Sequence, residues 1–565
     1  MIRTFNTSKT RKKTLLNGIW KFKTDAKAVG IKEKWYNDFP SDCGKTIVPS
    51  CWNNEADLYH YEGVCWYKTS FENSKSNINL LFHGVTGQAN VYVDGDCVGS
   101  HYGGFTGFSV EINNLKIGMH NLVVLVDNTH DDMNTIPLSV VDWFHYGGIT
   151  RDVELVELNN VWIKDCKINY ELSDELTTAR VRFDLALSSC KDGIYEKNLK
   201  IYCGTELLYE DKLSGRGETR FHLSEIEMKG IKLWDTDDPQ LYYFSFIIDG
   251  DDLTERIGFR KISIESRKIM LNNRQIHIKG INRHEDHPDW GFAMPLNLMK
   301  KDIDIIKKMG CNAIRGSHYP NAPVFLDMCD EEGLLFWEEI PMWGFPEEPL
   351  KNPVILKRGL TMHTEMVMRD YHHPCIIIWG MHNEIATDMK AGFDLTEAFA
   401  KHLKSMDNSR LITYATNRPL DDICFSLADI ISANVYIGWY NFEWHDKGEN
   451  AWPSFFEKFE KKLKNEGVAD KPIIMSEFGA GGIYGDKCLE ERKWSETYQA
   501  QYLDEVLTTF EKTPCVSGTY IWQYCDIRTP KENELGRPRS FNNKGILNEY
   551  RQPKLAYWVV KKKYS

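Results

Sequence analysis

The segment LNLMKKDIDIIKKMGCNAIRGSH, residues 296–318, indicates the fold of the larger part of this chain. Its first part places apolar residues at helical spacing and stops at Gly310, and NAIRGSH after it is typical of a short buried strand. The same alternation of strand and helix continues from about residue 270 to the last residues. The strand candidates are IHIKGIN (276–282), NAIRGSH (312–318), LLFWEEI (334–340), IIIWGMHNE (376–384), LITYATN (411–417), IISANVY (430–436), IIMSEFG (473–479) and GTYIWQY (518–524). Eight strand-and-helix units in about 250–300 residues predict a (β/α)8 barrel, which we assign to residues 263–565.

The residues before this barrel lack the alternation. Short apolar runs such as INLLFHGV (78–85) lie between turn signals, and Asp94-Gly95 is typical of a β-hairpin turn. We find no long amphipathic helical pattern here, which favours β-sandwiches. The pattern changes near VELVELNNVWIKD (153–165), so we predict one sandwich over residues 1–157 and a second, of immunoglobulin size, over residues 158–262.

The composition excludes several classes of function. The chain has 565 residues and a formal net charge of -12, which argues against a nucleic-acid partner or a membrane surface. It contains no apolar signal-peptide region and no run of about 18 uncharged apolar residues. The 14 cysteines are scattered without a Cys-x-x-Cys pair, which is typical of reduced thiols. We therefore expect a cytoplasmic protein with neither a nucleic-acid nor a membrane partner.

The sequence also predicts that no cofactor or metal is needed. It contains neither a phosphate-binding loop nor a dinucleotide-binding glycine pattern. The stretch HEDHPDW (284–290) gathers metal-ligand residue types, but its spacing fits no helical zinc motif.

Two carboxylates end buried strand patterns, Glu384 in CIIIWGMHNE and Glu477 in KPIIMSEFG. The 93 residues between them correspond to three units of about 31 residues, which places them on strands four and seven, facing each other across the barrel mouth. Two facing carboxylates suit glycoside hydrolysis, one as the acid and the other as the nucleophile, and a separation of about 5–5.5 Å gives a retaining reaction. We expect Asn383 to bond the 2-hydroxyl of the sugar. The alternative is that both acids only cap the following helices.

These residues resemble glycoside hydrolase family 2. The segments MGCNAIRGSHYP, WGMHNE and MSEFG are similar to its barrel motifs, and LNGIWKF, VPSCWN and GVCWYK to its N-terminal domain. The resemblance covers nearly the whole chain and implies a jelly-roll sugar-binding domain, an immunoglobulin-like sandwich and a catalytic barrel. It implies that Glu384 is the acid/base and Glu477 the nucleophile. Ile385 is a departure, since many members have proline after the acid/base residue.

Within the family, the chain resembles the β-glucuronidase branch, in the bacterial form without a long active-site loop. The similar segments are NVYIGWY (434–440) and VDWFHYGGITR (141–151). The resemblance implies sugar- or nucleophile-contacting roles for Asp142, His318, Asn434, Tyr436, Tyr440 and Trp522. The short connection after strand three predicts an open mouth, so we expect large glucuronides or oligosaccharide ends to be accepted at least as well as small aryl conjugates.

The basic stretch RPRSFNNKG (537–545) predicts the substrate class. A glucuronide carries a carboxylate at C6, and a pocket for it needs cations and amide donors. Asn542 and Lys544 match the Asn-x-Lys motif with which the β-glucuronidase branch reads that carboxylate. Pro538 stands where bacterial relatives have arginine, so either Arg537 or Arg539 completes the clamp.

The predicted function is therefore retaining exo-β-glucuronidase activity on terminal β-D-glucuronosides. A β-galacturonidase or a dual uronidase of the same fold is the first alternative. A β-galactosidase fits Asn542 and Lys544 less well, and a catalytically silent sugar-binding protein does not explain why both glutamates are present. From the family we also expect a homo-oligomer, either a tetramer or a dimer.

Overall fold

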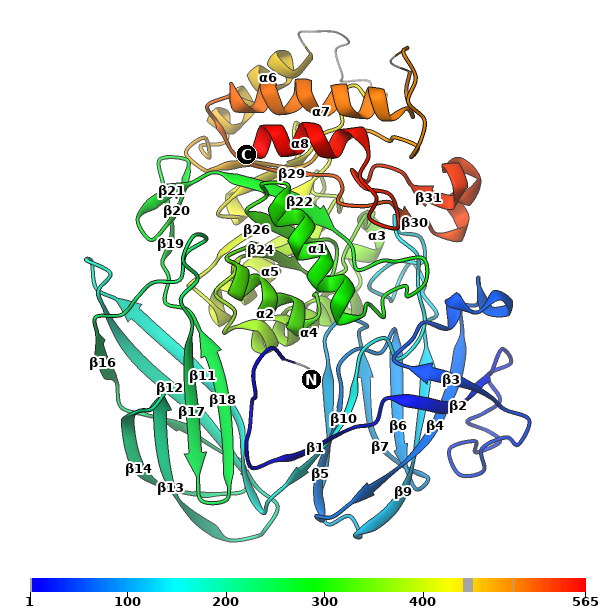
Figure 1. Ribbon diagram of the computed structural model, residues 1–565, viewed down its shortest axis with the longest axis vertical. Helices are drawn as coiled ribbons and strands as arrows, with labels where there is room; N and C mark the ends of the chain where they lie inside the picture. Colours follow the sequence, from blue (N-terminus) through cyan, green and yellow to red (C-terminus); the bar gives the residue numbers. More distant parts are fainter. Residues whose placement is uncertain (1–2, 441–450, 491) are drawn as a thin grey trace.

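The computed structural model describes residues 3–440, 451–490 and 492–565 (Figure 1). Two β-rich domains lie side by side at one end of the molecule, and a barrel surrounded by helices lies at the other. The N-terminal segment runs between the two β-rich domains.

The first domain is a sandwich of two antiparallel sheets with the strand orders β1-β10-β5-β8 and β3-β2-β4-β9-β6-β7. Its strands are β1 (Lys12–Leu15), β2 (Gly18–Thr24), β3 (Gly44–Val48), β4 (Val64–Asn73), β5 (Asn77–Phe82), β6 (Gln88–Val93), β7 (Asp96–Tyr102), β8 (Phe108–Ile112), β9 (Gly118–Asp127) and β10 (Val153–Leu158). Two short 3-10 helices, η1 (Trp52–Asn54) and η2 (Ala56–Leu58), lie between β3 and β4. Ile78, Leu80 and Phe82 alternate along β5 and are fully buried in the sandwich core, as the period of two in a strand requires.

The second domain is also a two-sheet sandwich. One sheet has the order β11-β12-β15, with β16 also paired to β12, and the other has the order β14-β13-β17-β18. Its strands are β11 (Val161–Leu172), β12 (Thr178–Ser189), β13 (Ile194–Cys203), β14 (Glu206–Arg216), β15 (Thr219–His222), β16 (Ile226–Lys229), β17 (Tyr242–Ile248) and β18 (Asp251–Ile257). A small antiparallel sheet of β19 (Ile262–Glu265), β20 (Lys268–Leu271) and β21 (Arg274–Ile276) leads into the barrel. The jelly-roll and immunoglobulin-like folds are thus confirmed, while residues 157 and 262 as domain boundaries stay predictions.

The barrel closes through eight parallel strands in chain order. They are β22 (Ile278–Arg283), β23 (Ala313–Gly316), β24 (Leu335–Glu339), β25 (Ile376–Asn383), β26 (Leu411–Thr416), β27 (Ile431–Asn434), β28 (Ile473–Glu477) and β29 (Val516–Ile521). Each of these strands overlaps one of the strand candidates. The prediction of a (β/α)8 barrel is confirmed, with Glu384 directly after the fourth strand and Glu477 at the end of the seventh.

Helices surround this barrel on the outside (Figure 1). They are α1 (Leu296–Lys308), α2 (Pro323–Glu332), α3 (Glu347–Leu350), α4 (Pro353–Asp370), α5 (Lys390–Met406), α6 (Ala451–Asn465), α7 (Glu496–Glu511) and α8 (Leu555–Tyr564), with the 3-10 helix η3 (Phe425–Leu427) before β27. After β29, the short strands β30 (Ile527–Arg528) and β31 (Phe541–Asn542) pair and enclose the 3-10 helices η4 (Lys531–Gly536) and η5 (Pro538–Ser540). This segment after β29 brings the RPRSFNNKG stretch to the barrel mouth.

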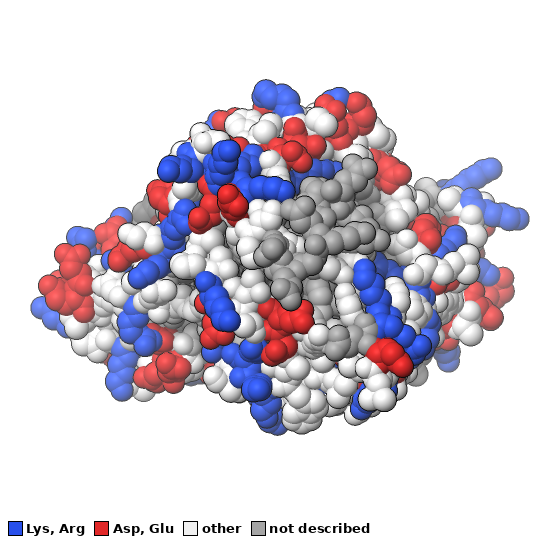
Figure 2. All heavy atoms as spheres, turned by 90° about the horizontal axis from the view of Figure 1, so that it is seen from above, with Lys and Arg blue, Asp and Glu red and all other residues white. Residues whose placement is uncertain are grey.

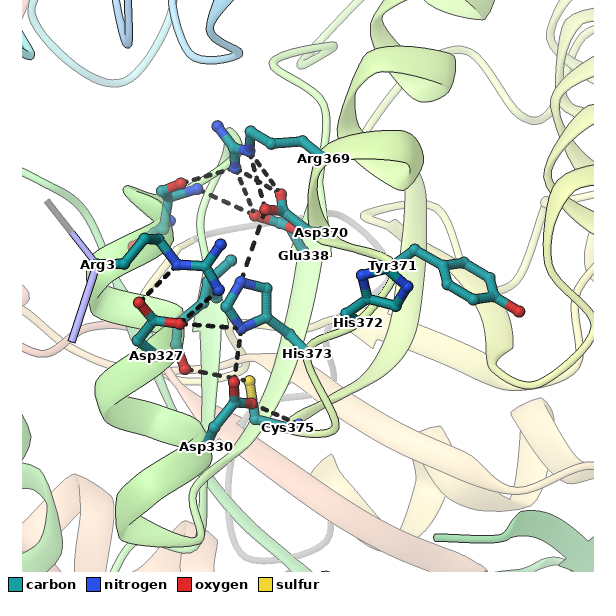
Figure 3. Close-up of polar contacts among 12 residues, drawn as sticks. Arg3, Asp327, Asp330, Glu338, Arg369, Asp370, Tyr371, His372, His373 and Cys375 are labelled. Atoms are coloured by element: carbon teal, nitrogen blue, oxygen red, sulfur yellow. Dashed lines mark hydrogen bonds and ion pairs between the residues drawn. The ribbon is translucent and has the colours of Figure 1, made fainter. Parts of the chain in front are cut away.

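A buried network of charges joins the domains (Figure 3). Arg3 of the N-terminal segment donates two hydrogen bonds of 2.7 Å to Asp327 of α2, and Arg256 of β18 reaches the same carboxylate at 3.0 Å. Asp330, one turn further along α2, accepts from Arg256 at 3.4 Å and pairs with His373 at 2.6 Å. Because each buried charge has an opposite partner, the network holds the second sandwich against the barrel without leaving a bare ion inside.

On the face in Figure 2, basic and acidic side chains are interspersed. Among the described residues, no helix combines the length and the apolar character needed to cross a bilayer. The 14 cysteines all lie in the described ranges, and each is a free thiol.

Candidate active site

A pocket with a cavity volume of about 290 Å³ opens at the carboxyl ends of the barrel strands. Its lining residues come from the barrel, from the first sandwich and from the segment after β29. They are Asp142, Trp343, Glu384, Asn417, Asn434, Tyr436, Tyr440, Glu477, Trp522, Asn533, Arg537 and Lys544. Both predicted catalytic glutamates are among them. The fold therefore brings together residues that lie up to 402 positions apart in the chain.

Two donors favour the ionised form of Glu477. Arg315 of β23 donates to Oε1 at 2.9 Å, and the Tyr436 hydroxyl donates to Oε2 at 2.8 Å. Burial raises the pKa of Glu477 to about 7, whereas Arg315 and the Tyr436 hydrogen bond act to lower it. A carboxylate with both oxygens fixed in this way is oriented for attack on a carbon in the pocket.

Glu384 differs from Glu477 in its hydrogen-bond donor, which is neutral. It adopts a left-handed backbone conformation (φ 54°) directly after β25, which turns its side chain out of the strand pattern, and such strain at a non-glycine residue is typical of functional positions. Its carboxyl has one neutral donor, Asn434, at 2.8 Å. Burial, with the nearby charge of Glu477 second, raises the pKa of Glu384 to about 8. The donors on Glu477 favour its ionised form more than the single amide donor favours that of Glu384, so Glu384 is the better candidate for the acid and Glu477 for the nucleophile.

Arg315 organises the layer beneath the two glutamates. Fully buried, it donates to Glu339 at 2.9 Å and to the Asn383 side-chain oxygen at 2.7 Å, as well as to Glu477. Asn434 also donates to that oxygen, at 3.2 Å. Both donors fix the orientation of the Asn383 amide, and its Nδ2 has no hydrogen-bond partner among the described residues. Asn383 is thus left with an unused donor, but it is not among the lining residues, so its contact with the sugar 2-hydroxyl stays a prediction.

His318 lies in the same layer and does not line the cavity. Its Nδ1 pairs with Glu339 at 2.7 Å, its ring stacks on Trp522 with centroids 5.1 Å apart, and Nε2 lies 3.9 Å from Glu477 Oε1. Burial, followed by the charge of Arg315, holds the pKa of His318 well below its usual range, so the ring is neutral. In this geometry His318 supports Trp522 from behind.

Two cations, Arg537 and Lys544, also line the pocket. Lys544 is 1% exposed, and its ammonium donates to the Tyr440 hydroxyl at 2.5 Å. Within the described ranges, no carboxylate pairs with this ammonium at ion-pair distance. Arg537 pairs with Asp142 at 2.9 Å, and Asn542 donates to the other oxygen of Asp142 at 2.8 Å. The cluster therefore contains two cations and one acid.

The structure separates the two candidate arginines. Arg537 lines the pocket, whereas Arg539 does not and instead pairs with Glu549 at 3.0 and 3.1 Å. Arg539 takes a left-handed conformation (φ 58°) after Pro538, so the chain turns between the two side chains. This geometry favours Arg537 over Arg539 as the carboxylate ligand.

Sequence reasoning missed four residues of the site. They are Arg315, which holds Glu477, and three lining residues, Trp343, Asn417 and Asn533. Asn417 ends a strand candidate, so the rule that polar residues at the carboxyl ends of barrel strands line the mouth could have found it, whereas Arg315 lies in the middle of its candidate. Trp343 and Asn533 lie in connections and carried no comparable signal.

Among the described residues, one group of side chains is close enough to hold a metal, namely Asp330, His373 and Cys375, and none of the three lines the pocket (Figure 3). The Asp330 carboxylate already accepts from His373 Nδ1, from the Cys375 backbone amide at 3.0 Å and from Arg256. Burial raises the pKa of the Cys375 thiol well above its usual range, which disfavours the thiolate that a metal needs. These side chains fit a structural hydrogen-bond network.

Three family models match consecutive parts of the chain. "Glycosyl hydrolases family 2, sugar binding domain" matches residues 13–159, "Glycosyl hydrolases family 2" matches residues 161–260, and "Glycosyl hydrolases family 2, TIM barrel domain" matches residues 262–565. A β-glucuronidase from Paenibacillus borealis is 26% identical over 98% of this chain and 97% of its own length.

Solved structures are similar over the whole chain. A family 2 β-galacturonidase from Eisenbergiella tayi, solved with galacturonate, is 36% identical with a TM-score of 0.92, covering 100% of this chain and 99% of that one. A β-glucuronidase from Ruminococcus gnavus, solved with D-glucuronic acid, is 27% identical with a TM-score of 0.87 at the same coverage.

Proposed function

Because this chain belongs to glycoside hydrolase family 2, we propose that it is a retaining, exo-acting β-uronidase whose first candidate substrates are terminal β-D-glucuronosides. The observation that carries the proposal is that the buried Lys544 ammonium has no carboxylate partner among the described residues. A buried ammonium without a carboxylate partner is costly, and the C6 carboxylate of a uronide supplies that partner. A neutral glucoside or galactoside has only a hydroxymethyl group at this position.

Arg537 and Asn542 complete the proposed uronate subsite. Both contact Asp142, which balances the charge of the arginine while the pocket is empty of substrate and accepts hydrogen bonds from sugar hydroxyls when a substrate binds. Charge-assisted hydrogen bonds of this kind are stronger than neutral ones, so the cluster orients the sugar as well as selecting it.

The reaction follows from the two glutamates. The Glu477 carboxylate attacks the anomeric carbon, the bond from this carbon to the leaving-group oxygen breaks, and Glu384 gives that oxygen its proton. Glu384, now ionised, then takes a proton from water, whose oxygen attacks the same carbon. The bond to Glu477 breaks, and the free uronic acid leaves with its original anomeric configuration.

β-D-Galacturonosides are the second candidate. The observation that favours them is the 36% identity with the E. tayi β-galacturonidase, compared with 27% for the R. gnavus β-glucuronidase at equal coverage. The two sugars differ only at C4, where the hydroxyl points in opposite directions, and both present the same carboxylate to Lys544.

The experiment is a paired measurement of kcat/KM on 4-nitrophenyl β-D-glucuronide and β-D-galacturonide, with the anomer of the first product followed by NMR. Release of a β-uronic acid from either substrate supports the proposal, and the faster substrate fixes the epimer. Release of the α-anomer contradicts the retaining mechanism, and no turnover of either uronide contradicts uronidase activity.

A further inference from the structure

Two of the unexpected lining residues, Trp343 and Asn417, lie on either side of the acid/base residue. The backbone amide of Asn383 donates to Met342 at 2.8 Å, and the Asn383 carbonyl accepts from Gly344 at 2.9 Å, so Trp343 lies directly beside this segment. On the opposite side, the Glu384 amide donates to the Ala415 carbonyl at 2.9 Å, two residues before Asn417. Glu384 therefore lies between the segments that carry the Trp343 indole and the Asn417 amide.

The position relative to the acid determines which part of a substrate these residues meet. Glu384 protonates the oxygen of the leaving group, so the leaving group must lie next to Glu384 during the reaction. The uronate-binding residues Arg537 and Lys544 line the same pocket but come from the segment after β29, whereas Trp343 and Asn417 flank the end of β25. Trp343 and Asn417 thus belong to the leaving-group side.

The chemistry of the two side chains is complementary to a sugar ring. The Trp343 side chain is partly exposed in the pocket, with its ring supported edge-on by Trp143 at a centroid distance of 6.2 Å. The side-chain oxygen of Asn417 is buried and has no hydrogen-bond partner among the described residues. An aromatic face can pack on the C–H face of a pyranose, and an unpaired amide oxygen can accept from one of its hydroxyls.

We propose that Trp343 and Asn417 form a leaving-group subsite that selects a pyranose, so that the enzyme removes uronic acid from the non-reducing ends of oligosaccharides. An aryl leaving group without hydroxyls can stack on the indole, but it leaves the Asn417 oxygen desolvated and without a hydrogen bond. Because an unpaired buried acceptor costs binding free energy, such a leaving group is disfavoured relative to a pyranose. The inference rests on the proposed uronidase function and adds the class of the leaving group.

The test compares two substrates that share the uronic acid accepted by the wild type: its 4-nitrophenyl β-glycoside and its β-linked disaccharide with galactose. Asn417→Ala is expected to lower kcat/KM for the disaccharide by roughly 3–10-fold more than for the aryl uronide, because the hydrogen bond that it removes is worth about 0.5–1.5 kcal/mol. Equal losses on both substrates, or a larger loss on the aryl uronide, would overturn the subsite.

A second variant addresses the indole with a different readout. Galactose added to an aryl-uronide reaction competes with water for the glycosyl-enzyme and forms uronosyl-galactose if the subsite binds a pyranose. Trp343→Leu is expected to lower the ratio of transfer to hydrolysis severalfold, and an unchanged ratio contradicts the proposal. A wild type that cleaves aryl uronides but not the disaccharide refutes the subsite alone, whereas a wild type inactive on both aryl uronides refutes the uronidase function itself.

Discussion

The Tyr436 hydroxyl donates a 2.8 Å hydrogen bond to Oε2 of Glu477, the proposed nucleophile, while Arg315 holds the other oxygen at 2.9 Å. Asn434, two residues before Tyr436, donates to Glu384 instead. One short segment after β27 thus contacts both catalytic carboxylates. Arg315 donates a hydrogen bond to Glu477, and its charge also acts to lower the pKa of Glu384.

The first prediction is a narrow, bell-shaped pH dependence of kcat/KM. As the pH falls below about 7, Glu477 takes up a proton and can no longer attack, and as the pH rises above about 8, Glu384 loses the proton that it must donate. The two groups interact, so the limbs report the pair rather than either residue alone. Initial rates on a 4-nitrophenyl uronide between pH 4 and 10 measure both limbs; a profile that still rises above pH 10 would contradict Glu384 as the acid.

Tyr436→Phe removes a hydrogen bond that favours the ionised form of Glu477. The pKa of Glu477 should rise, so the acidic limb should move to higher pH while the alkaline limb moves less. Tyr484→Phe is the matched control, because this exposed tyrosine does not line the pocket. An acidic limb that stays in place in Tyr436→Phe would show that the tyrosine does not tune the nucleophile.

The second prediction separates the acid from the nucleophile. Glu384→Ala should lower kcat/KM by about 10²–10⁴-fold for an alkyl uronide, whose leaving group needs a proton, and far less for a 4-nitrophenyl uronide, whose phenolate leaves unaided. Glu477→Ala should abolish turnover of both substrates with the fold intact. Equal sensitivity of the two substrates to Glu384→Ala would contradict the assignment of roles, and full residual activity in Glu477→Ala would contradict it as well.

The third prediction uses the two neighbouring arginines as a matched pair. Arg537→Ala should lower kcat/KM for the preferred uronide by roughly 10–100-fold, since a hydrogen bond to a charged group is worth about 1.5–3 kcal/mol. Arg539→Ala removes the same side chain from an ion pair with Glu549 outside the pocket and should change kcat/KM by less than about twofold. A larger loss in Arg539→Ala than in Arg537→Ala would reverse the assignment.

Much of this architecture could be predicted from residue patterns because strand and helix periodicity is local. The 93-residue spacing placed Glu384 and Glu477 on the fourth and seventh barrel strands, and the end of each strand fixes on which face the side chain emerges. The choice between Arg537 and Arg539 could not be predicted, because it depends on the left-handed turn at Arg539 and on Glu549 ten residues later.

Other features depended on contacts that no local pattern encodes. Trp343 approaches the acid only because its segment pairs with the end of β25, and Arg315 reaches Glu477 across the barrel interior. The cytoplasmic location and the homo-oligomer stay predictions, since neither follows from the contacts of a single chain.

The central claim is that a buried cation selects uronides, and Lys544→Met tests it most directly. The wild type should cleave a 4-nitrophenyl β-uronide in strong preference to 4-nitrophenyl β-D-glucoside and β-D-galactoside. The isosteric methionine should reduce the uronide-to-neutral ratio of kcat/KM by roughly 10–100-fold, mainly by slowing the uronide, because it removes a charge-assisted hydrogen bond of about 1.5–3 kcal/mol. A wild type that hydrolyses the neutral sugars as fast as the uronide, or a Lys544→Met variant whose ratio is unchanged, would contradict the account.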